Sequence, residues 1–171
     1  KDFRPPSAGG ETGEYYQRML MEVDEALKNY QEEFPLLKGM KPKWGGFIWF
    51  QGWNDMFNQD ALAQYEENLV HLIKDLRAHL NQPNLPVVVG ELGNMGEDAG
   101  TNMKFIREAQ RKACQRKEWK GRVSFVKTTN FARPKEESPN VGHGHHWFGN
   151  AESYFLIGDA LGKEMVRLLQ K

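Results

Sequence analysis

Apolar residues recur along the chain in two alternating patterns, one typical of helices and the other of buried strands. Helical spacing predicts four helices, the first ending before Pro35 and the third, around 103–113, being the weakest. We expect Thr12 to cap the first helix, Asp60 the second and Asn150 the last. Short polar side chains at these positions accept hydrogen bonds from the free N–H groups of the first turn.

Three short apolar runs lie between these helices, at 45–50, 86–90 and 123–126. Each continuous run, bounded by glycine or proline in the first two cases, is typical of a strand buried on both faces. The resulting alternation of helix and strand predicts an α/β domain with a parallel sheet. Three strands are few for such a sheet, because its edges would expose rows of backbone donors and acceptors. The pattern therefore predicts that further strands belong to it.

Length and composition exclude several classes of protein. The chain has 171 residues, of which 39% are hydrophobic and 27% charged, which is typical of one globular domain rather than a disordered protein. Its 23 basic and 23 acidic residues give a net charge of zero, so the charge balance favours neither nucleic acid nor a membrane surface as partner. No segment has the apolar length of a membrane helix, and residues 1–10 lack the apolar core of a signal peptide.

The residues that follow the predicted strands are the candidates for chemistry, because ligands of open parallel sheets bind at the carboxyl ends of the strands. The first strand is followed by the segment 51–55, the second by Glu91, and the third, after a loop, by 143–147. We therefore expect an amide, carboxylates and imidazoles to converge at one edge of the sheet. That is the composition of an acyl-transfer or hydrolytic site.

Two of these segments resemble motifs of a known superfamily. Gly52-Trp53-Asn54-Asp55 is similar to the Gly-x-Asn-Asp block of the SGNH hydrolases, and 49–55 resembles the Trp-x-Gln-Gly segment of the sialate O-acetylesterase-like and acetylxylan esterase-like branch. The segment 146–151 resembles the block that carries the catalytic histidine of the family. The resemblance extends through nearly all of the chain. It implies a three-layer, flavodoxin-like α/β fold, with helices on both faces of a parallel sheet.

The resemblance implies catalytic roles for three residues. Asn54 would donate a hydrogen bond to the oxyanion, Gly52 would let the backbone approach it closely, and His146 would be the general base for a serine nucleophile. The side chains suit these roles, since an amide donates without titrating and an imidazole exchanges protons near neutral pH. Trp53 and Trp147 flank this site, where stacking on sugar rings and packing as buried aromatics are both open interpretations.

The sequence leaves the acid partner of His146 open. The usual Asp-x-x-His pattern of the family would place a carboxylate at His143, and a Gln-Gly-Glu pattern would place one at Trp53. Neither position holds a carboxylate. The remaining candidates for orienting the base or lining the site are a backbone carbonyl, Asp55, Glu91 and Gln51.

The sequence also lacks the nucleophile of the family, a serine in a Gly-x-Ser block on the first strand, together with a second glycine block. Residues 2–7 resemble sequence that follows this second block. None of the four serines, at 7, 124, 138 and 153, lies on a strand-to-helix turn. We therefore expect 1–171 to be the C-terminal part of a single SGNH hydrolase domain whose N-terminal strands are missing. A companion N-terminal segment or chain would supply the serine.

The sequence thus predicts a carbohydrate O-acetyl esterase acting on an acetylated sugar or polysaccharide, inactive as this chain alone and using no cofactor. The resemblance suggests a periplasmic or secreted enzyme, and the sequence otherwise leaves the location open. One alternative is a metal-dependent hydrolase using His143, His145 and His146 with Glu91. Another is a non-catalytic carbohydrate-binding module on an esterase scaffold.

Overall fold

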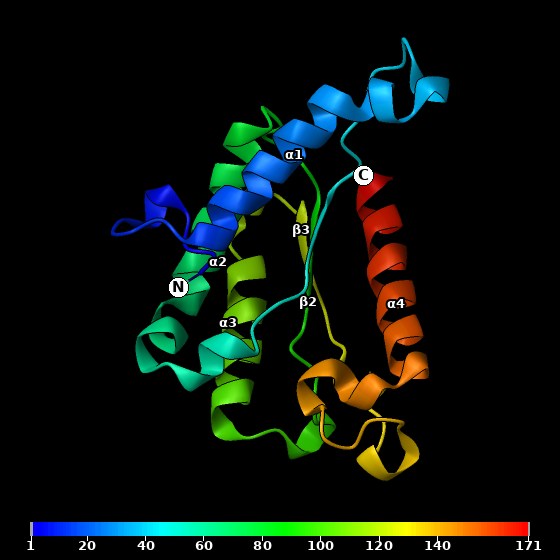
Figure 1. Ribbon diagram of the computed structural model, residues 1–171. Helices are drawn as coiled ribbons and strands as arrows, with labels where there is room; N and C mark the ends of the chain where they lie inside the picture. The colour runs from blue at the N-terminus through cyan, green and yellow to red at the C-terminus, as the bar shows by residue number, and fades with distance from the viewer. Residues whose placement is uncertain (1, 171) are drawn as a thin grey trace.

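A three-stranded parallel sheet, covered by helices, forms the centre of the computed structural model, which describes residues 2–170 (Figure 1). The strands β1 (Phe47–Trp49), β2 (Val87–Gly90) and β3 (Val123–Val126) lie in that order, with β2 in the middle. The long helices are α1 (Glu14–Glu33), α2 (Gln59–His79), α3 (Thr101–Cys114) and α4 (Ala151–Leu169). The predicted alternation and the parallel sheet are confirmed. No helix in the described part of the chain is both long and apolar enough to cross a membrane.

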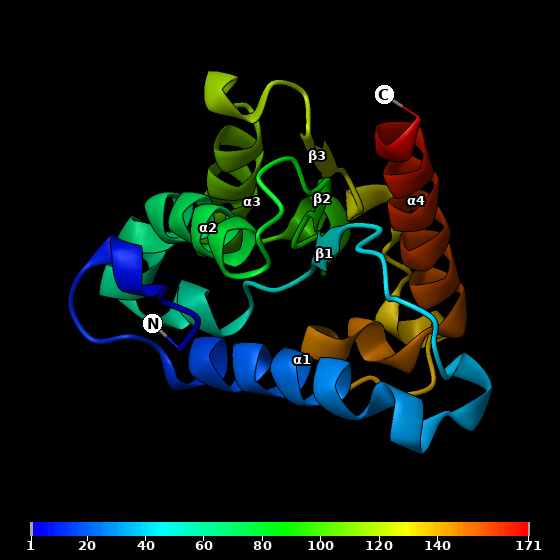
Figure 2. The same cartoon turned by 90° about the horizontal axis from the view of Figure 1, so that it is seen from above.

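Successive residues of β2 face two separate hydrophobic cores, because side chains alternate across a strand. Val87 and Val89 belong to a core that includes residues of α2 and α3, whereas Val88 packs with Ile157 and Leu161 of α4. Figure 2 shows α2 and α3 on one side of the sheet and α4 on the other. This is the three-layer arrangement expected from the sequence.

The two outer strands are less buried than the sequence indicates. In and just after β1, Ile48 is 46% exposed and Phe50 38% exposed, and three of the four residues of β3 are only half-buried. The prediction that all three strands are buried on both faces is therefore wrong for β1 and β3. Both lie at edges of the sheet, and α4 packs mainly against β2 and β3, which leaves the Ile48 side of β1 uncovered.

The helix α1 lies apart from the sheet, and only Tyr16 among its residues is buried (Figure 2). The predicted cap at Thr12 is wrong, because Gly13 is the N-cap residue and no side chain caps this helix. The backbone carbonyl of Asp2 accepts hydrogen bonds from the N–H groups of Tyr15 and Tyr16 at 3.0 and 3.3 Å. A carbonyl from a preceding segment thus satisfies the free donors that a side-chain cap would otherwise bind.

The predicted caps of α2 and α4 differ in their outcome. Asn58, and not Asp60 as predicted, caps α2, since its Oδ1 accepts a hydrogen bond from the Ala61 N–H at 2.9 Å. Asp60 lies inside the first turn. The predicted cap of α4 is confirmed, because Asn150 Oδ1 accepts a hydrogen bond from the N–H of Ser153 at 3.1 Å.

Candidate functional site

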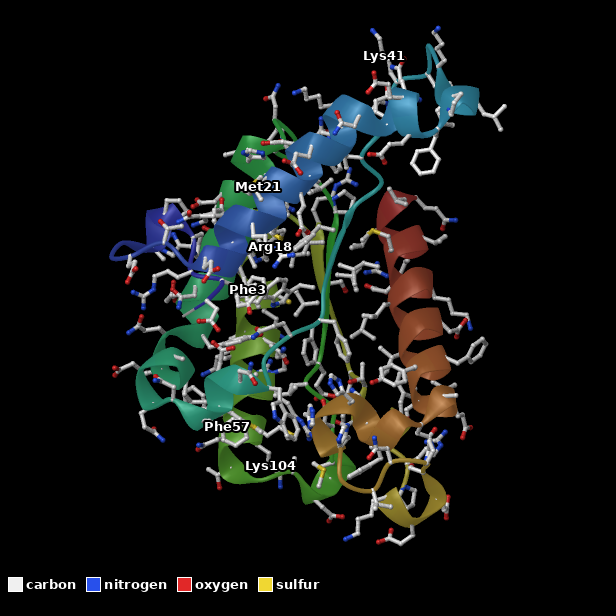
Figure 3. The ribbon with its side chains drawn as sticks, in the orientation of Figure 1. Phe3, Arg18, Met21, Lys41, Phe57 and Lys104 are labelled. Atoms are coloured by element: carbon white, nitrogen blue, oxygen red, sulfur yellow. The ribbon has the colours of Figure 1, made fainter. Side chains whose placement is uncertain are left out.

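A cleft of about 560 Å³ opens beyond the carboxyl ends of the strands. The loop after β1 contributes 50–54 to its wall, the loop after β2 contributes Leu92 and Asn94, and the segment before α4 contributes 145–147. Figure 3 shows Phe57 of the adjoining loop at the same end of the molecule as the orange segment before α4. The segments expected to converge at one edge of the sheet therefore do so.

Asn54 and His146 both line this cleft. Asn54 is the first residue of the 3₁₀ helix Asn54–Phe57, and His146 lies within the 3₁₀ segment Gly144–Gly149. Both residues are exposed, and neither side chain forms a hydrogen bond with another residue in 2–170. An amide and an imidazole are therefore available to a ligand in one cleft.

Gly52 lets the loop after β1 pass directly over α3. Its φ of +148° is one that residues with a side chain rarely adopt, and an added Cβ would lie 2.9 Å from Ile106 Cγ2. The preceding residue, Gln51, lines the cleft and donates a hydrogen bond from Nε2 to Asp55 Oδ2 at 2.5 Å. Close packing of the backbone at Gly52 thus sets the direction in which the loop reaches Asn54.

An unusual turn of the backbone follows His146. Trp147 and Phe148 have φ values of 51° and 53°, in the left-handed region, which costs roughly 1–2 kcal/mol for each residue that is not glycine. Both side chains are buried, and the Trp147 ring stacks on Phe50 with centroids 6.2 Å apart. Burial of two large aromatic side chains offsets the cost of the turn. Trp147 is therefore a packing residue that anchors the segment carrying His146.

Trp53 is the more accessible of the two tryptophans proposed from the sequence. It is half-buried, lines the cleft, and packs edge-on against Phe57 with ring centroids 6.0 Å apart. The His145 ring, which also lines the cleft, lies 5.8 Å from the Trp53 ring. One wall of the cleft is thus aromatic.

Sequence reasoning missed two buried residues that hold the loop after β2. Asn94 donates from Nδ2 to the carbonyls of Gly144 and His145 at 3.0 and 3.2 Å. Arg107 of α3 donates from Nε to Leu92 O at 2.7 Å and from Nη2 to Asn94 O at 2.8 Å. Burial lowers the pKa of Arg107, although the nearby Glu91 and Glu97 carboxylates oppose the shift.

Gln110 is a third residue that the sequence analysis missed. It is fully buried, and its Oε1 accepts from the Leu92 N–H at 2.9 Å while its Nε2 donates to Gln51 O at 2.9 Å. Tyr65 Oη of α2 donates to the same Gln51 carbonyl at 2.8 Å, and burial raises the pKa of Tyr65. One amide therefore joins the loops after β1 and β2 from beneath the cleft.

Neither carboxylate proposed from the sequence lines the cleft. Glu91 is buried, and its Oε2 accepts from the N–H groups of Thr128 and Thr129, both at 2.8 Å, and from Thr129 Oγ1 at 2.6 Å. It thereby ties the loop after β2 to the loop after β3, which is a structural role. Asp55 lines a separate, smaller cavity beside Tyr65.

The three neighbouring histidines form a cluster, with ring centroids 4.3 Å apart for His145 and His146 and 5.2 Å apart for His143 and His145. Desolvation and the two neighbouring imidazoles lower the pKa of His145. Within 2–170, no group of three or more His, Cys, Asp or Glu side chains is arranged to hold a metal ion. Glu91, the carboxylate of the metal alternative, is held by the threonines instead.

None of the four serines lines the cleft. Ser124 Oγ donates to Glu164, Ser138 Oγ to Pro134 O, and the buried Ser153 to Phe131 O. Ser7 Oγ, in the 3₁₀ helix Pro6–Ala8, forms a hydrogen bond of 2.7 Å with Nδ1 of His71 on α2, but neither residue lines the cleft.

The single cysteine is equally remote from the cleft. Cys114 is buried at the end of α3, and burial raises its pKa to about 12. Its thiol is thus held in the protonated form, which is a poor nucleophile.

Comparisons with known proteins agree with this architecture. The family model described as carbohydrate esterase, sialic acid-specific acetylesterase, matches residues 4–167. The probable carbohydrate esterase At4g34215 of Arabidopsis thaliana is 30% identical over 95 residues, which are 56% of this chain and 31% of that protein. The X-ray structure of At4g34215 has a TM-score of 0.62 to this chain at 21% identity, covering 91% of this chain and 53% of the other.

The chain thus spans about half the length of the solved relative, and the likeness between the two structures concerns the fold. The parallel sheet with helices on both faces is consistent with an SGNH-like fold. The family model covers almost the whole sequence, from residue 4 to residue 167. This chain therefore belongs to the carbohydrate esterase family of sialic acid-specific acetylesterases.

Proposed function

We propose that this chain is the C-terminal part of a single esterase domain that removes O-acetyl groups from a sugar or polysaccharide. Asn54 and His146 supply the oxyanion donor and the general base of that site. The observation that carries the proposal is that this amide and this imidazole line one cleft, with no side-chain hydrogen bond to other residues in 2–170. Membership of a carbohydrate esterase family supports the reaction class.

The proposed reaction follows a serine acyl-enzyme route. His146 accepts the proton of the serine hydroxyl as its oxygen attacks the acetyl carbonyl carbon, and the Asn54 amide donates a hydrogen bond to the oxyanion that forms. The tetrahedral intermediate collapses, and the sugar hydroxyl leaves with the proton held by His146. Water then attacks the acetyl-serine in the same way, which releases acetate and regenerates the serine.

We infer that the nucleophilic serine comes from a companion segment. The support for this is that none of the serines at 7, 124, 138 and 153 lines the cleft. In addition, among the residues that the structure describes, β1 pairs with β2 on one side only, and Ile48 and Phe50 remain substantially exposed. A further parallel strand beside β1 would cover this edge and would end at the same side of the sheet as Asn54.

The aromatic wall of the cleft supports a carbohydrate as substrate. Trp53 presents a ring to the cleft beside His145, and Phe57 backs it at 6.0 Å. An aromatic face packs well against the apolar face of a sugar ring, whose hydroxyl groups stay in the polar part of the cleft. Trp147 also lines the cleft, but its ring is buried against Phe50 and is less accessible than that of Trp53.

Substitution of the two proposed groups tests this function. In an active protein that contains this chain, His146→Ala and Asn54→Ala should each lower turnover of an acetylated sugar or an aryl acetate by at least about 10²-fold, without loss of folding. His71→Ala is the matched control, since His71 lies on α2 away from the cleft. Turnover near the wild-type value in His146→Ala or Asn54→Ala would refute the assignment.

A carbohydrate-binding module without catalysis is the second candidate, because neither Glu91 nor Asp55 lines the cleft with His146. A labelled, serine-reactive phosphonate separates the two functions. We expect the assembled protein to take up the label and to lose the uptake in the His146→Ala variant. Sugar binding without any labelling would favour the module.

A further inference from the structure

The segment that carries His146 is held through its backbone by a residue of another loop. We propose that Asn94, supported by Arg107, is the positioning residue for His146; this inference rests on the proposed role of His146 as general base. Asn94 lies in the loop after β2, about 50 residues before the segment that it holds. The contact therefore joins two loops that meet only in the folded protein.

The side chain of Asn94 is buried and fixed by hydrogen bonds. It is 2% exposed, and its Nδ2 donates to the carbonyls of Gly144 and His145, at 3.0 and 3.2 Å. These are the two residues directly before His146 in the sequence. Since an amide nitrogen carries two hydrogens, both donors of Asn94 are committed to the backbone, and neither is left for a substrate.

Arg107 fixes Asn94 in turn. Its guanidinium is buried within the protein and donates to Asn94 O at 2.8 Å and to Leu92 O at 2.7 Å. Arg107 belongs to α3, which is packed against α2 in the core. A rigid helix, a guanidinium and an amide thus connect the core of the domain to the histidine segment.

The other side of His146 is held by Tyr154 of α4, whose Oη donates to His146 O at 2.9 Å. The backbone of His146 is thus held between Asn94 and Tyr154, while its imidazole is free of protein hydrogen bonds within 2–170. Because no carboxylate within 2–170 is hydrogen-bonded to the His146 imidazole, the orientation of this ring depends on its backbone. A shift of about 1 Å at a catalytic group is enough to cost about 10²-fold in rate.

The chain offers a matched control for this network. Arg77 of α2 is as buried as Arg107, with 9% against 8% exposure, and donates from Nε and Nη2 to Leu85 O at 3.1 and 2.7 Å. Leu85 lies two residues before β2, as Leu92 lies two residues after it. Arg77→Met and Arg107→Met therefore each remove a buried guanidinium that bonds a backbone carbonyl, at opposite ends of the same strand, and only the end held by Arg107 faces the cleft.

The test compares Asn94→Ala, Arg107→Met and Arg77→Met in the active protein containing this chain. We expect the first two to lower kcat by about 10- to 100-fold while KM stays within about twofold, because they misplace the base without removing substrate contacts. Arg77→Met should change kcat by no more than about twofold, whatever its effect on stability. If Asn94→Ala does not fold, Asn94→Ser takes its place in the test. Serine keeps one donor, so its kcat should fall by less than the loss expected for Asn94→Ala.

Histidine NMR gives a second readout that does not depend on activity. The His146 ring signal should shift or broaden in Asn94→Ala and Arg107→Met, whereas the His71 and His79 signals stay unchanged in these two variants. In Arg77→Met, the signals of all three rings should stay unchanged. A folded Asn94→Ala with wild-type kcat and an unmoved His146 signal would overturn the inference. So would a rise in KM at constant kcat, which indicates substrate contact instead. If His146→Ala keeps full turnover, the proposed function fails, and the NMR comparison still decides the positioning role.

Discussion

At Gly52 the backbone runs so close to α3 that no side chain fits. We expect Gly52→Ala to lower the free energy of unfolding by about 1–3 kcal/mol, because the Cβ would meet Ile106 and the positive φ would be strained. Urea denaturation measures the change. The same substitution should lower turnover as well, since it displaces the loop that carries Asn54.

Gly158→Ala is the control for this substitution. Gly158 lies within α4, and its added Cβ would meet nothing within 4 Å. Alanine there should leave stability unchanged or raise it by about 0.5–1 kcal/mol, because alanine loses less backbone entropy in a helix. Equal losses at both glycines would show that the contact with Ile106 is unimportant.

The two proposed site residues that line the cleft were easier to predict from the sequence than the buried residues that hold its loops. Asn54 and His146 follow a strand and precede a helix, so their position in the sequence already indicated the edge of the sheet. Arg107 and Gln110 look like ordinary polar positions of α3 until the fold brings Leu92 and Gln51 to them. A signal was present, since both lie at helical spacing from the apolar positions of α3 and so belong to its buried face.

At the level of the elements, substitutions at the start of α2 show whether Asn58 or Asp60 caps this helix. Asn58→Ala should lower the free energy of unfolding by about 1 kcal/mol, because the Ala61 N–H loses its acceptor. Asp60→Ala should cost about 0.5 kcal/mol or less, since Asp60 contributes only through the helix dipole. Thermal or urea unfolding measures both.

High salt separates the hydrogen bond of the Asn58 cap from the charge–dipole interaction of Asp60. The loss in Asn58→Ala should persist in about 1 M salt, whereas that of Asp60→Ala should disappear, because charge–dipole interactions of exposed groups are screened. A larger loss in Asp60→Ala than in Asn58→Ala would contradict the assignment of the cap.

The strands show a different limit of sequence reasoning. Their apolar runs predicted the position and the parallel arrangement of all three, because a short continuous apolar stretch in an α/β chain is typical of a strand in a parallel sheet. The runs did not reveal that Ile48 would be exposed, since burial of an edge strand depends on what lies beside it. A pattern along one segment carries no information about a neighbour contributed by another segment.

For the whole molecule, the uncovered side of β1 leads to a prediction about the isolated chain. The 171-residue chain alone should aggregate or lack esterase activity, because Ile48, Phe50 and the open strand edge face solvent. Addition of an N-terminal companion segment that carries the Gly-x-Ser block should restore both order and activity. Light scattering and an aryl acetate assay measure the two effects.

A companion whose block serine is replaced by alanine is the matched control. It should restore a monodisperse protein without restoring turnover, since it covers β1 but brings no nucleophile. The prediction fails if the purified chain, shown by mass to be free of any companion, is monomeric, folds cooperatively and hydrolyses an acetyl ester using one of its own four serines.

The polar network beneath the cleft also bears on how this scaffold can be re-engineered. Gln110, Arg107 and Glu91 hold the three strand-end loops from the interior. Trp53, which lines the cleft, and the exposed Phe57 beside it take no part in that network. If the proposed function holds, a mutant library confined to these two positions should alter the choice of sugar while Asn54 and His146 keep their places, so that selectivity is evolved separately from catalysis.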